Sequence, residues 1–286
     1  MRLEVTQFCE MNMNRKNIAA FILLPVMASV LLFACHKSAI SDNNQPVDTA
    51  FALSYGDSIL YLQPSAGDYI ISPKEYREGT YTGFPEGIEI DDKTGAINLS
   101  KSETGLRYLV TYISPKGDTS QTKVVLSGIT FKDKLYYLSE NDTIAAPIYN
   151  ASTIRPLPLA GSSFDEGNTA NSGGCSVKTT DGQINLAQTL RNGVFGVTPT
   201  NDAKQEFDIL YRLNDDSKKS LNKIRVKVYY YETINDLTPD LIETLQSRQD
   251  DGVFIGLRTT GAAPLSSKVL KTARPRPPCI VVIAKK

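Results

Sequence analysis

The chain has 286 residues, of which 41% are hydrophobic and 22% charged, a composition typical of globular proteins. This length allows two ordinary domains or three small ones, each with its own core. Basic and acidic side chains balance to a formal net charge of zero, which argues against a nucleic-acid partner because phosphate binding needs a basic face. The 14 Tyr and 10 Phe, set among many Val, Ile and Thr, favour an all-β fold.

The N-terminal segment has the pattern of an export signal. Arg15 and Lys16 precede an apolar run, IAAFILLPVMASVLLFA, that ends at Ala34 directly before Cys35. A charged start followed by an apolar run is typical of a signal peptide. The ending LFAC resembles the lipobox of bacterial lipoproteins, which implies that Cys35 becomes the acylated first residue of the mature protein.

This resemblance predicts a signal peptide over residues 1–34 and a lipid-anchored flexible tether over residues 35–47. The membrane partner is then reached through the acyl chains on Cys35, in the cell envelope and at the outer membrane, with the leaflet undetermined. A single transmembrane anchor is the alternative, because the apolar run is at the short limit for spanning a bilayer.

The rest of the chain contains an internal repeat. Residues 87–99 (GIEIDDKTGAINL) align without gaps with residues 174–186 (GCSVKTTDGQINL), and both glycines and the Ile-Asn-Leu triplet are identical. Two flanking blocks keep the same order: residues 53–59 align with 138–144, and residues 123–131 with 223–231. A period of 85 to 100 residues is that of an immunoglobulin-like sandwich. We therefore predict two copies of one module, residues 48–131 and 132–231, with the extra residues of the second copy in Arg191–Lys204.

Each copy reads as a pair of hairpins. In the first copy, apolar residues alternate with polar ones on both sides of Asp91–Gly95, where Asp can bond its own backbone and Gly accepts positive φ. A second hairpin is predicted from Tyr108–Ile113 into Lys123–Phe131, and its counterpart from Phe207–Leu213 into Lys223–Tyr231.

The stretch from Phe84 to Ile97, with Gly105 and the Tyr-Leu-Val-Thr at Tyr108, resembles the immunoglobulin-like, cadherin-like domains of bacterial surface proteins. Those domains carry a Pro-x-Gly-(Leu/Ile), an Asp-x-x-Thr-Gly turn and a closing Gly with Tyr-x-Val-Thr. The second copy keeps the glycines but has Lys178 in the turn and lacks the Pro. The resemblance implies two tandem immunoglobulin-like β-sandwiches, a fold used for spacers, adhesion modules and accessory glycan-binding modules.

Residues 232–286 predict a small α+β cap on the second module. Thr238 is a suitable N-cap with Pro239 at the first helical position, which predicts a helix to about Gln249. A strand is expected over residues 252–257. CIVVIA at residues 279–284 is apolar throughout, which predicts a strand buried on both faces.

No set of residues predicts a catalytic, metal or cofactor site. Gly56-Asp57-Ser58-Ile59 resembles the nucleophile block of one esterase family, but the only His is His36, beside the anchor. A hydrolase that uses carboxylates remains a third hypothesis without a motif. The acidic pairs at Asp91, Asp215 and Asp250 lack the order of a calcium loop and read as turn acids. The chain is therefore predicted to be no enzyme and to need no cofactor.

Two further features concern modification. Cys175 and Cys279 either form a disulfide in the oxidising envelope or stay as separate thiols, with Cys175 aligned to the inward-facing Ile88 as a buried apolar residue. Thr49, Ser58 and Thr143 each fit an Asp-(Ser/Thr)-apolar pattern that resembles O-glycan acceptor sites of envelope proteins. The alternative is that these residues simply open strands.

The function predicted from the sequence is that of a cell-envelope lipoprotein serving as a structural, adhesion or assembly module. The alternative is an accessory glycan-binding lipoprotein of a polysaccharide-uptake system. The absence of Trp argues against the second, although Tyr136, Tyr137 and Tyr229–Tyr231 could offer rings to a sugar. A specific partner, protein or glycan, is expected to contact what the copies do not share, above all Arg191–Lys204 and the C-terminal residues.

Overall fold

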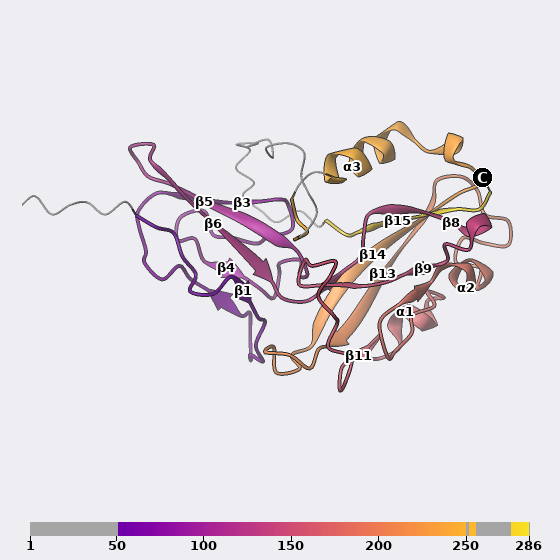
Figure 1. The fold of residues 1–286 in the computed structure, drawn as a ribbon, viewed down its shortest axis with the longest axis horizontal. Coiled ribbons are helices and arrows are strands. Elements are labelled where there is room, and N and C mark those ends of the chain that lie inside the picture. Colours follow the sequence, from indigo (N-terminus) through magenta and orange to yellow (C-terminus); the bar gives the residue numbers. More distant parts are fainter. Residues whose placement is uncertain (1–50, 250–251, 256–275, 286) are drawn as a thin grey trace, which may run out of the picture. The chain divides into compact units, whose positions relative to one another are not determined.

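The structure is a computed structural model that describes residues 51–249, 252–255 and 276–285 (Figure 1). Residues Asp48–Lys286 form one compact unit. Strands dominate the described residues and helices are few and short, so the predicted all-β class is confirmed.

The first sheet has four strands, and the predicted hairpin forms its centre. Its members are β1 (Ile59–Leu60), β3 (Thr80–Phe84), β5 (Arg107–Ile113) and β6 (Thr119–Leu126). They lie in the order β1-β6-β5-β3, with β1 parallel to β6 and the other pairs antiparallel. Every second residue of β5 is buried, as the period of a half-buried strand requires. A separate antiparallel pair is formed by β2 (Ile70–Ile71) and β4 (Ile97–Asn98).

The second sheet has five strands and includes the C-terminal end of the chain. It lies in the order β11 (Ser163–Phe164), β13 (Ala203–Arg212), β14 (Asn222–Tyr231), β15 (Cys279–Ile283) and β8 (Lys134–Tyr137). β11, β13 and β14 pair antiparallel, whereas β14, β15 and β8 run parallel. The smaller pairs are β12 (Ile184–Asn185) with β9 (Ile144–Ala145), and β10 (Ile148–Tyr149) with β7 (Ile129–Thr130).

The helical elements lie outside the sheets. They are α1 (Thr169–Ser172), α2 (Leu186–Arg191) and α3 (Pro239–Gln249), with two single 3₁₀ turns at η1 (Leu138–Glu140) and η2 (Ile234–Asp236). α3 begins and ends at the residues that the sequence predicts, because Pro fits the first helical position, whose N–H has no partner within the helix.

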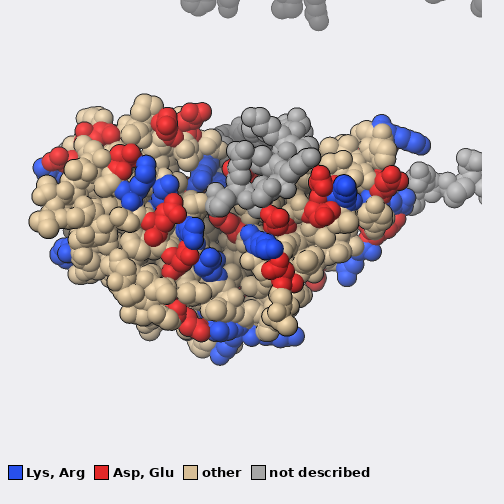
Figure 2. Space-filling model, turned by 180° about the vertical axis from the view of Figure 1, so that it is seen from behind, with Lys and Arg blue, Asp and Glu red and all other residues tan. Residues whose placement is uncertain are grey.

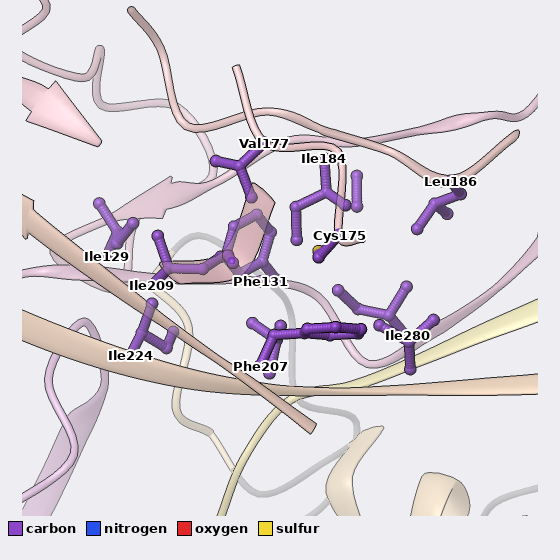
Figure 3. Close-up of a cluster of buried hydrophobic side chains, with 14 of the residues drawn as sticks. Ile129, Phe131, Cys175, Val177, Ile184, Leu186, Phe207, Ile209, Ile224 and Ile280 are labelled. Atoms are coloured by element: carbon purple, nitrogen blue, oxygen red, sulfur yellow. The ribbon is translucent and has the colours of Figure 1, made fainter. Parts of the chain in front are cut away.

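The second sheet has a hydrophobic cluster on each face. On one face Ile280 and Val282 of β15 pack into the main cluster, which includes Phe131, Cys175 and Phe207 (Figure 3). On the other face Val281 and Ile283 pack with Tyr231 and with Leu241 of α3. All five residues of β15 are buried, which confirms the strand predicted to be buried on both faces.

The two segments of the main repeat have the same backbone bonds. Ile90 and Ile97 form an isolated antiparallel bridge, and so do Val177 and Ile184, the residues 87 positions later. Gly95 and Gly182 have φ of 71° and 72°, and each donates its N–H to the carbonyl four residues earlier. A side chain is excluded at both glycines, because a Cβ there would lie 2.6 Å from Tyr81 and 2.7 Å from Phe164.

The invariant Asn of the repeat holds a turn together with a hydroxyl. Asn98 Oδ1 accepts from the N–H of Lys101, and Asn185 Oδ1 accepts from that of Gln188. The hydroxyl of Ser102 donates to the carbonyl of Asn98, and Thr189 does the same to Asn185. The same hydroxyls accept from the N–H groups of residues 89 and 176. The triplet is therefore retained because Asn, followed four residues later by Ser or Thr, satisfies these backbone groups.

Two sequence predictions are wrong in detail. The first is the alignment of residues 53–59 with 138–144: Ile59 pairs with β6, whereas Ile144 pairs with Asn185, which makes Ile70 the counterpart of Ile144. β8 precedes β9 in the chain as β1 precedes β2, so β8 is the strand in the second copy that corresponds to β1.

The second is the C-terminal cap. β15 belongs inside the second sheet. Of the strand predicted over residues 252–257, Val253 and Phe254 pack in the core of the first sheet and Ile255 forms an isolated bridge to Ser152, while residues 256 and 257 lie outside the described residues. Pairing between distant strands decided both cases, and local pattern does not report it. The extra residues of the second copy lie between Thr189, the counterpart of Ser102, and the start of β13.

Candidate functional site

The residues proposed for modification lie at separate places. Cys35 and Thr49 lie outside the described residues. Ser58 is exposed and directly precedes β1, whereas Thr143 is half-buried and directly precedes β9. The backbone carbonyls of both residues accept hydrogen bonds, from Val125 and Leu186, so both positions have a structural role beside any modification.

The two cysteines are free and buried. Cys175 lies in the main hydrophobic cluster beside Ile184 and Phe207 (Figure 3). Cys279 is the register partner of Lys227, and its Sγ lies 3.3 Å from Nη1 of Arg248 on α3. The thiols therefore sit on opposite faces of one sheet, because successive residues of a strand point to opposite sides. A bond between them would have to cross the sheet, so this arrangement favours the alternative of two separate thiols. Burial raises the pKa of Cys175 to about 12.

Most of the tyrosines considered for sugar stacking belong to the core. Tyr136, Tyr230 and Tyr231 are buried, and Tyr137 and Tyr229 pack partly against the cluster beneath α3. The hydroxyl of Tyr231 donates to Asp202, which further fixes its ring.

Asp91 and Asp215 act as local caps, and Asp250 lies outside the described residues. Asp91 Oδ1 accepts from the N–H and the hydroxyl of Thr94 and from the N–H of Lys93, and these bonds hold the pKa of Asp91 below its usual range. Asp215 accepts from the N–H of Ser217 and from the hydroxyl of Tyr149. Over residues 51–249, 252–255 and 276–285, no group of three or more His, Cys, Asp and Glu side chains could hold a metal ion.

The most elaborate polar site lies where the two sheets meet, and Tyr211 is at its centre. The hydroxyl of Tyr211 lies 2.8 Å from Oγ1 of Thr104, which follows the repeated turn of the first copy. It also accepts the N–H of Ile129 at 3.1 Å. Tyr211 is fully buried, and burial raises its pKa to about 12. A single side chain of β13 thus joins the second sheet to two segments of the first copy, at Thr104 and at Ile129.

Neighbouring residues extend this contact, and we call the whole set the junction: Glu103, Thr104, Ser127, Gly128, Ile129, Tyr149, Asn150, Tyr211 and Asp215. Asn150 exchanges two bonds with Gly128, its N–H donating to the carbonyl and its Oδ1 accepting from the N–H. Asp215 Oδ2 accepts from Tyr149 at 2.7 Å and from Ser127 at 3.4 Å. Ser127, Thr130 and Asn150 are all buried, so the connection is packed rather than solvated.

A group of charged residues adjoins the junction beside β15. Asp133 Oδ1 accepts from Arg248 at 3.1 Å and from the N–H of Cys279 at 2.6 Å. Glu103 Oε1 accepts from the N–H of Arg276 at 2.6 Å. Burial raises the pKa of Glu103 to about 7, against the opposing effect of the bond from Arg276 and of its positive charge. Paired charges with little exposure are costly to separate, so these contacts fix the start of β15.

A cleft of about 600 Å³ opens beside Glu103, between the repeated turn of the first copy and the start of β14. Its charged side chains already have partners: Arg225 makes two bonds to Asp208, at 2.7 and 3.0 Å, and Lys101 pairs with Asp68 at 2.7 Å. Figure 2 shows basic and acidic side chains interspersed on the face that it draws, with no single-sign patch. Such a surface favours no strongly charged ligand.

Sequence reasoning missed Tyr211, Glu103, Asp133 and Arg248. Tyr211 belongs to an alternating run, which marks it as inward-facing but not as a hydrogen-bonding residue. The contacts of the other three join segments more than a hundred residues apart, and no local signal reports them. Within the described ranges, none of the helices has the length and apolar character needed to cross a membrane.

Comparison with known proteins gives little. No family model matches the sequence, and a search of curated proteins finds no match. Among solved structures, the chain is weakly similar to the crystal structure of Drosophila N-cadherin EC1-4, at 14% identity and a TM-score of 0.19 over 60% of this chain. The match spans less than half of that structure, 46%, and at this TM-score the likeness carries no argument.

Proposed function

We propose that the chain is a cell-envelope lipoprotein, anchored through Cys35, that acts as a structural, adhesion or assembly module without catalysis. Its two sheets, with the smaller strand pairs, then correspond to two tandem immunoglobulin-like sandwiches that hold a binding surface at a distance from the membrane. The shared hydrogen-bond pattern of residues 87–99 and 174–186 supports this assignment.

The observation that carries the proposal is the junction. A spacer that transmits force or presents a surface needs its modules to move as one body. The buried bonds of Tyr211 to Thr104 and Ile129 provide this, because a buried hydrogen bond is costly to leave unmade. The paired charges that line the cleft also favour a structural role over the binding of a charged substrate.

The glycan-binding alternative is not favoured by a specific observation. Three of its five candidate rings, Tyr136, Tyr230 and Tyr231, are buried, and the other two are partly buried, which removes most of the flat exposed faces that sugars stack on. A glycan-array screen of the soluble residues 36–286 tests it directly. Strong binding that is lost on Tyr229→Ala would replace our proposal with the alternative.

The anchor is tested by mass spectrometry of the protein purified from envelope membranes. We expect an N-terminal peptide that begins at Cys35 and carries acyl chains, and release of the Cys35→Ala variant from the membrane fraction. An unacylated N-terminus elsewhere would contradict the lipoprotein assignment.

The module role is tested by photo-crosslinking in cells. Val197 and Ile154 are large apolar side chains that are almost fully exposed, and Val197 lies in the extra residues of the second copy. A photoreactive residue at position 197 is expected to capture a discrete partner in the envelope. The control is the same residue at Tyr76, which is exposed in the first copy. Equal adducts from both positions, or none from either, would contradict a specific surface on the second copy.

A further inference from the structure

β15 occupies a position in the second sheet that has no counterpart in the first sheet. In the first sheet, the opening strand β1 pairs directly and in parallel with the last strand β6. In the second sheet, the corresponding strands β8 and β14 do not touch, because β15 lies between them and pairs in parallel with both (Figure 1). The second copy is therefore completed by a strand that comes from outside its own run of residues.

The contacts of β15 are nearly all made with other parts of the chain. Its five residues pair with Lys227–Tyr231 on one side, and four of them with Lys134–Tyr137 on the other. Beyond the strand, the N–H groups of Ala284 and Lys285 donate to the carbonyls of Tyr231 and Glu232 at 3.0 and 2.8 Å. At the other end, Asp133 accepts the N–H of Cys279. These contacts define a complete binding site for an extended segment.

The covalent route to β15 is long. Twenty residues, 256–275, separate Ile255 from Arg276, and a fully extended chain of that length can reach about 70 Å. A chain of this length does not by itself require that the strand enter its own sheet.

We propose that the gap between β8 and β14 is a strand-acceptor site, and that its partner in assembly is the C-terminal strand of a second copy. An exchanged strand makes the same contacts in the second copy as in its own, so exchange forfeits no contact of the sheet. Insertion within one chain is favoured in dilute solution, because the connection keeps the strand at an effective concentration of about millimolar. Exchange competes where copies fold together at high local density, as on a membrane.

The ends of the strand make this site selective for the protein's own C-terminus. The N–H of Arg276 is held by Glu103, and Lys285 pairs with Glu232. Between them, residues 280–284 are apolar and pack alternately into the two hydrophobic clusters on the faces of the sheet. An arbitrary strand would lack the guanidinium of Arg276, whose Nη2 lies 4.0 Å from Oδ2 of Asp133, and would leave that largely buried carboxylate with one positive partner fewer, at a cost in binding.

The inference extends the assembly role proposed above, and its test uses soluble protein. It can therefore fail while the envelope role stands, and the envelope role can fail while the exchange is observed.

The test uses two chains of residues 36–286, both carrying Cys175→Ala. The acceptor chain carries Lys227→Cys and Cys279→Ala, and the donor chain keeps Cys279. Lys227 and Cys279 are register partners on adjacent strands. Neighbouring strands lie about 4.8 Å apart, within the Cα separation that a disulfide spans. The two chains are unfolded together in denaturant, refolded at high concentration and oxidised. Neither chain can form this bond internally, so a disulfide-linked heterodimer requires the donor's β15 in the acceptor's sheet.

One control shows that the geometry allows the bond: a single chain with Lys227→Cys and native Cys279 is expected to close it internally. A second control moves the acceptor thiol to Lys223→Cys, an exposed position of the same strand that has no partner on β15. We expect the heterodimer from the Lys227→Cys acceptor and not from the Lys223→Cys acceptor. No heterodimer while the internal control forms would overturn the proposal, and so would equal amounts from the two acceptors.

Discussion

The two sheets differ in the strand that pairs in parallel with the second strand of their long hairpin, β6 in the first sheet and β14 in the second. The first uses a strand of two residues, β1, that precedes its other members in the chain. The second inserts β15, which is five residues long, buried on both faces and taken from the end of the chain. The copies thus share the hydrogen bonds of the repeated turn but not the strand that completes the sheet. The difference teaches that the second sheet cannot be complete until residues 279–283 have been synthesised, which ties its stability to residues that a repeat alignment leaves unmatched.

The largest effect is expected from a substitution in β15, which tests whether this strand completes the second sheet. Ile280→Ala removes a fully buried side chain from the main cluster. We expect it to lower the free energy of unfolding by about 2–5 kcal/mol, because the loss of transfer energy adds to the cost of a cavity. Denaturant unfolding of the soluble chain measures this. The control Ile70→Ala, at a side chain 55% exposed in β2, should change it by less than about 0.5 kcal/mol. Equal effects would mean that β15 does not complete the sheet.

The next prediction concerns Glu103, which belongs to the first copy and binds the segment that leads into β15. Burial raises its pKa from 4.5 to about 7 in the folded chain. Between these pH values the unfolded chain releases the proton and the folded chain keeps it, so the free energy of unfolding should fall as pH rises. Glu103 should lower the free energy of unfolding by an amount on the order of 3 kcal/mol. This loss is absent below pH 4.5 and complete above about pH 7.

Denaturant unfolding across this pH range measures the effect. Glu103→Gln keeps an oxygen acceptor for the N–H of Arg276 and removes the titration, so its profile should be flatter than that of the native chain. Parallel profiles for the two proteins would show that Glu103 does not titrate in this window.

A smaller effect is expected from the hydroxyl that joins the two copies. Tyr211→Phe leaves Thr104 and the N–H of Ile129 without their partner, which should cost about 1–3 kcal/mol of unfolding free energy. Combining it with Thr104→Val in a double-mutant cycle should give a coupling energy of about 0.5–3 kcal/mol. Tyr76→Phe, at an exposed ring, is the control. Strict additivity would mean that the copies are not coupled through this contact.

The smallest effects test what the copies have in common. Ser102→Ala and Thr189→Val each remove a hydroxyl that donates to one backbone group and accepts from another. Each should lower the free energy of unfolding by about 1 kcal/mol, and by similar amounts, because the two networks are alike. A cost several times larger in one copy would show that the shared geometry hides unequal roles.

Local chemistry made part of the fold predictable. Gly95 and Gly182 need positive φ, and the Asp91 turn and the Pro239 start of α3 follow from the bonds of a few neighbouring residues. The apolar run of β15 correctly predicts burial on both faces. Its place between β8 and β14 was not predictable, because a hydrophobic pattern fixes which faces are buried and not which strands are neighbours.

The failed alignment of residues 138–144 with 53–59 has the same cause. Leu-Ser and Asp-(Ser/Thr)-Ile recur by composition, but Ile144 pairs with β12 and Ile59 with β6. The junction could be predicted even less. The hydroxyl of Tyr211 bonds Thr104 and Ile129, and the carboxyl of Glu103 bonds Arg276, and only the folded chain brings these residues together.

Amide hydrogen exchange of the soluble chain, read by mass spectrometry, tests the position of β15 most directly. If β15 is an inner strand of the second sheet, the amides of residues 280–283 should exchange as slowly as those of β13 and β14, because exchange from a central strand requires global opening. Exchange at the rate of an exposed C-terminal tail would contradict the account, since the second sheet would then lack the strand that closes it.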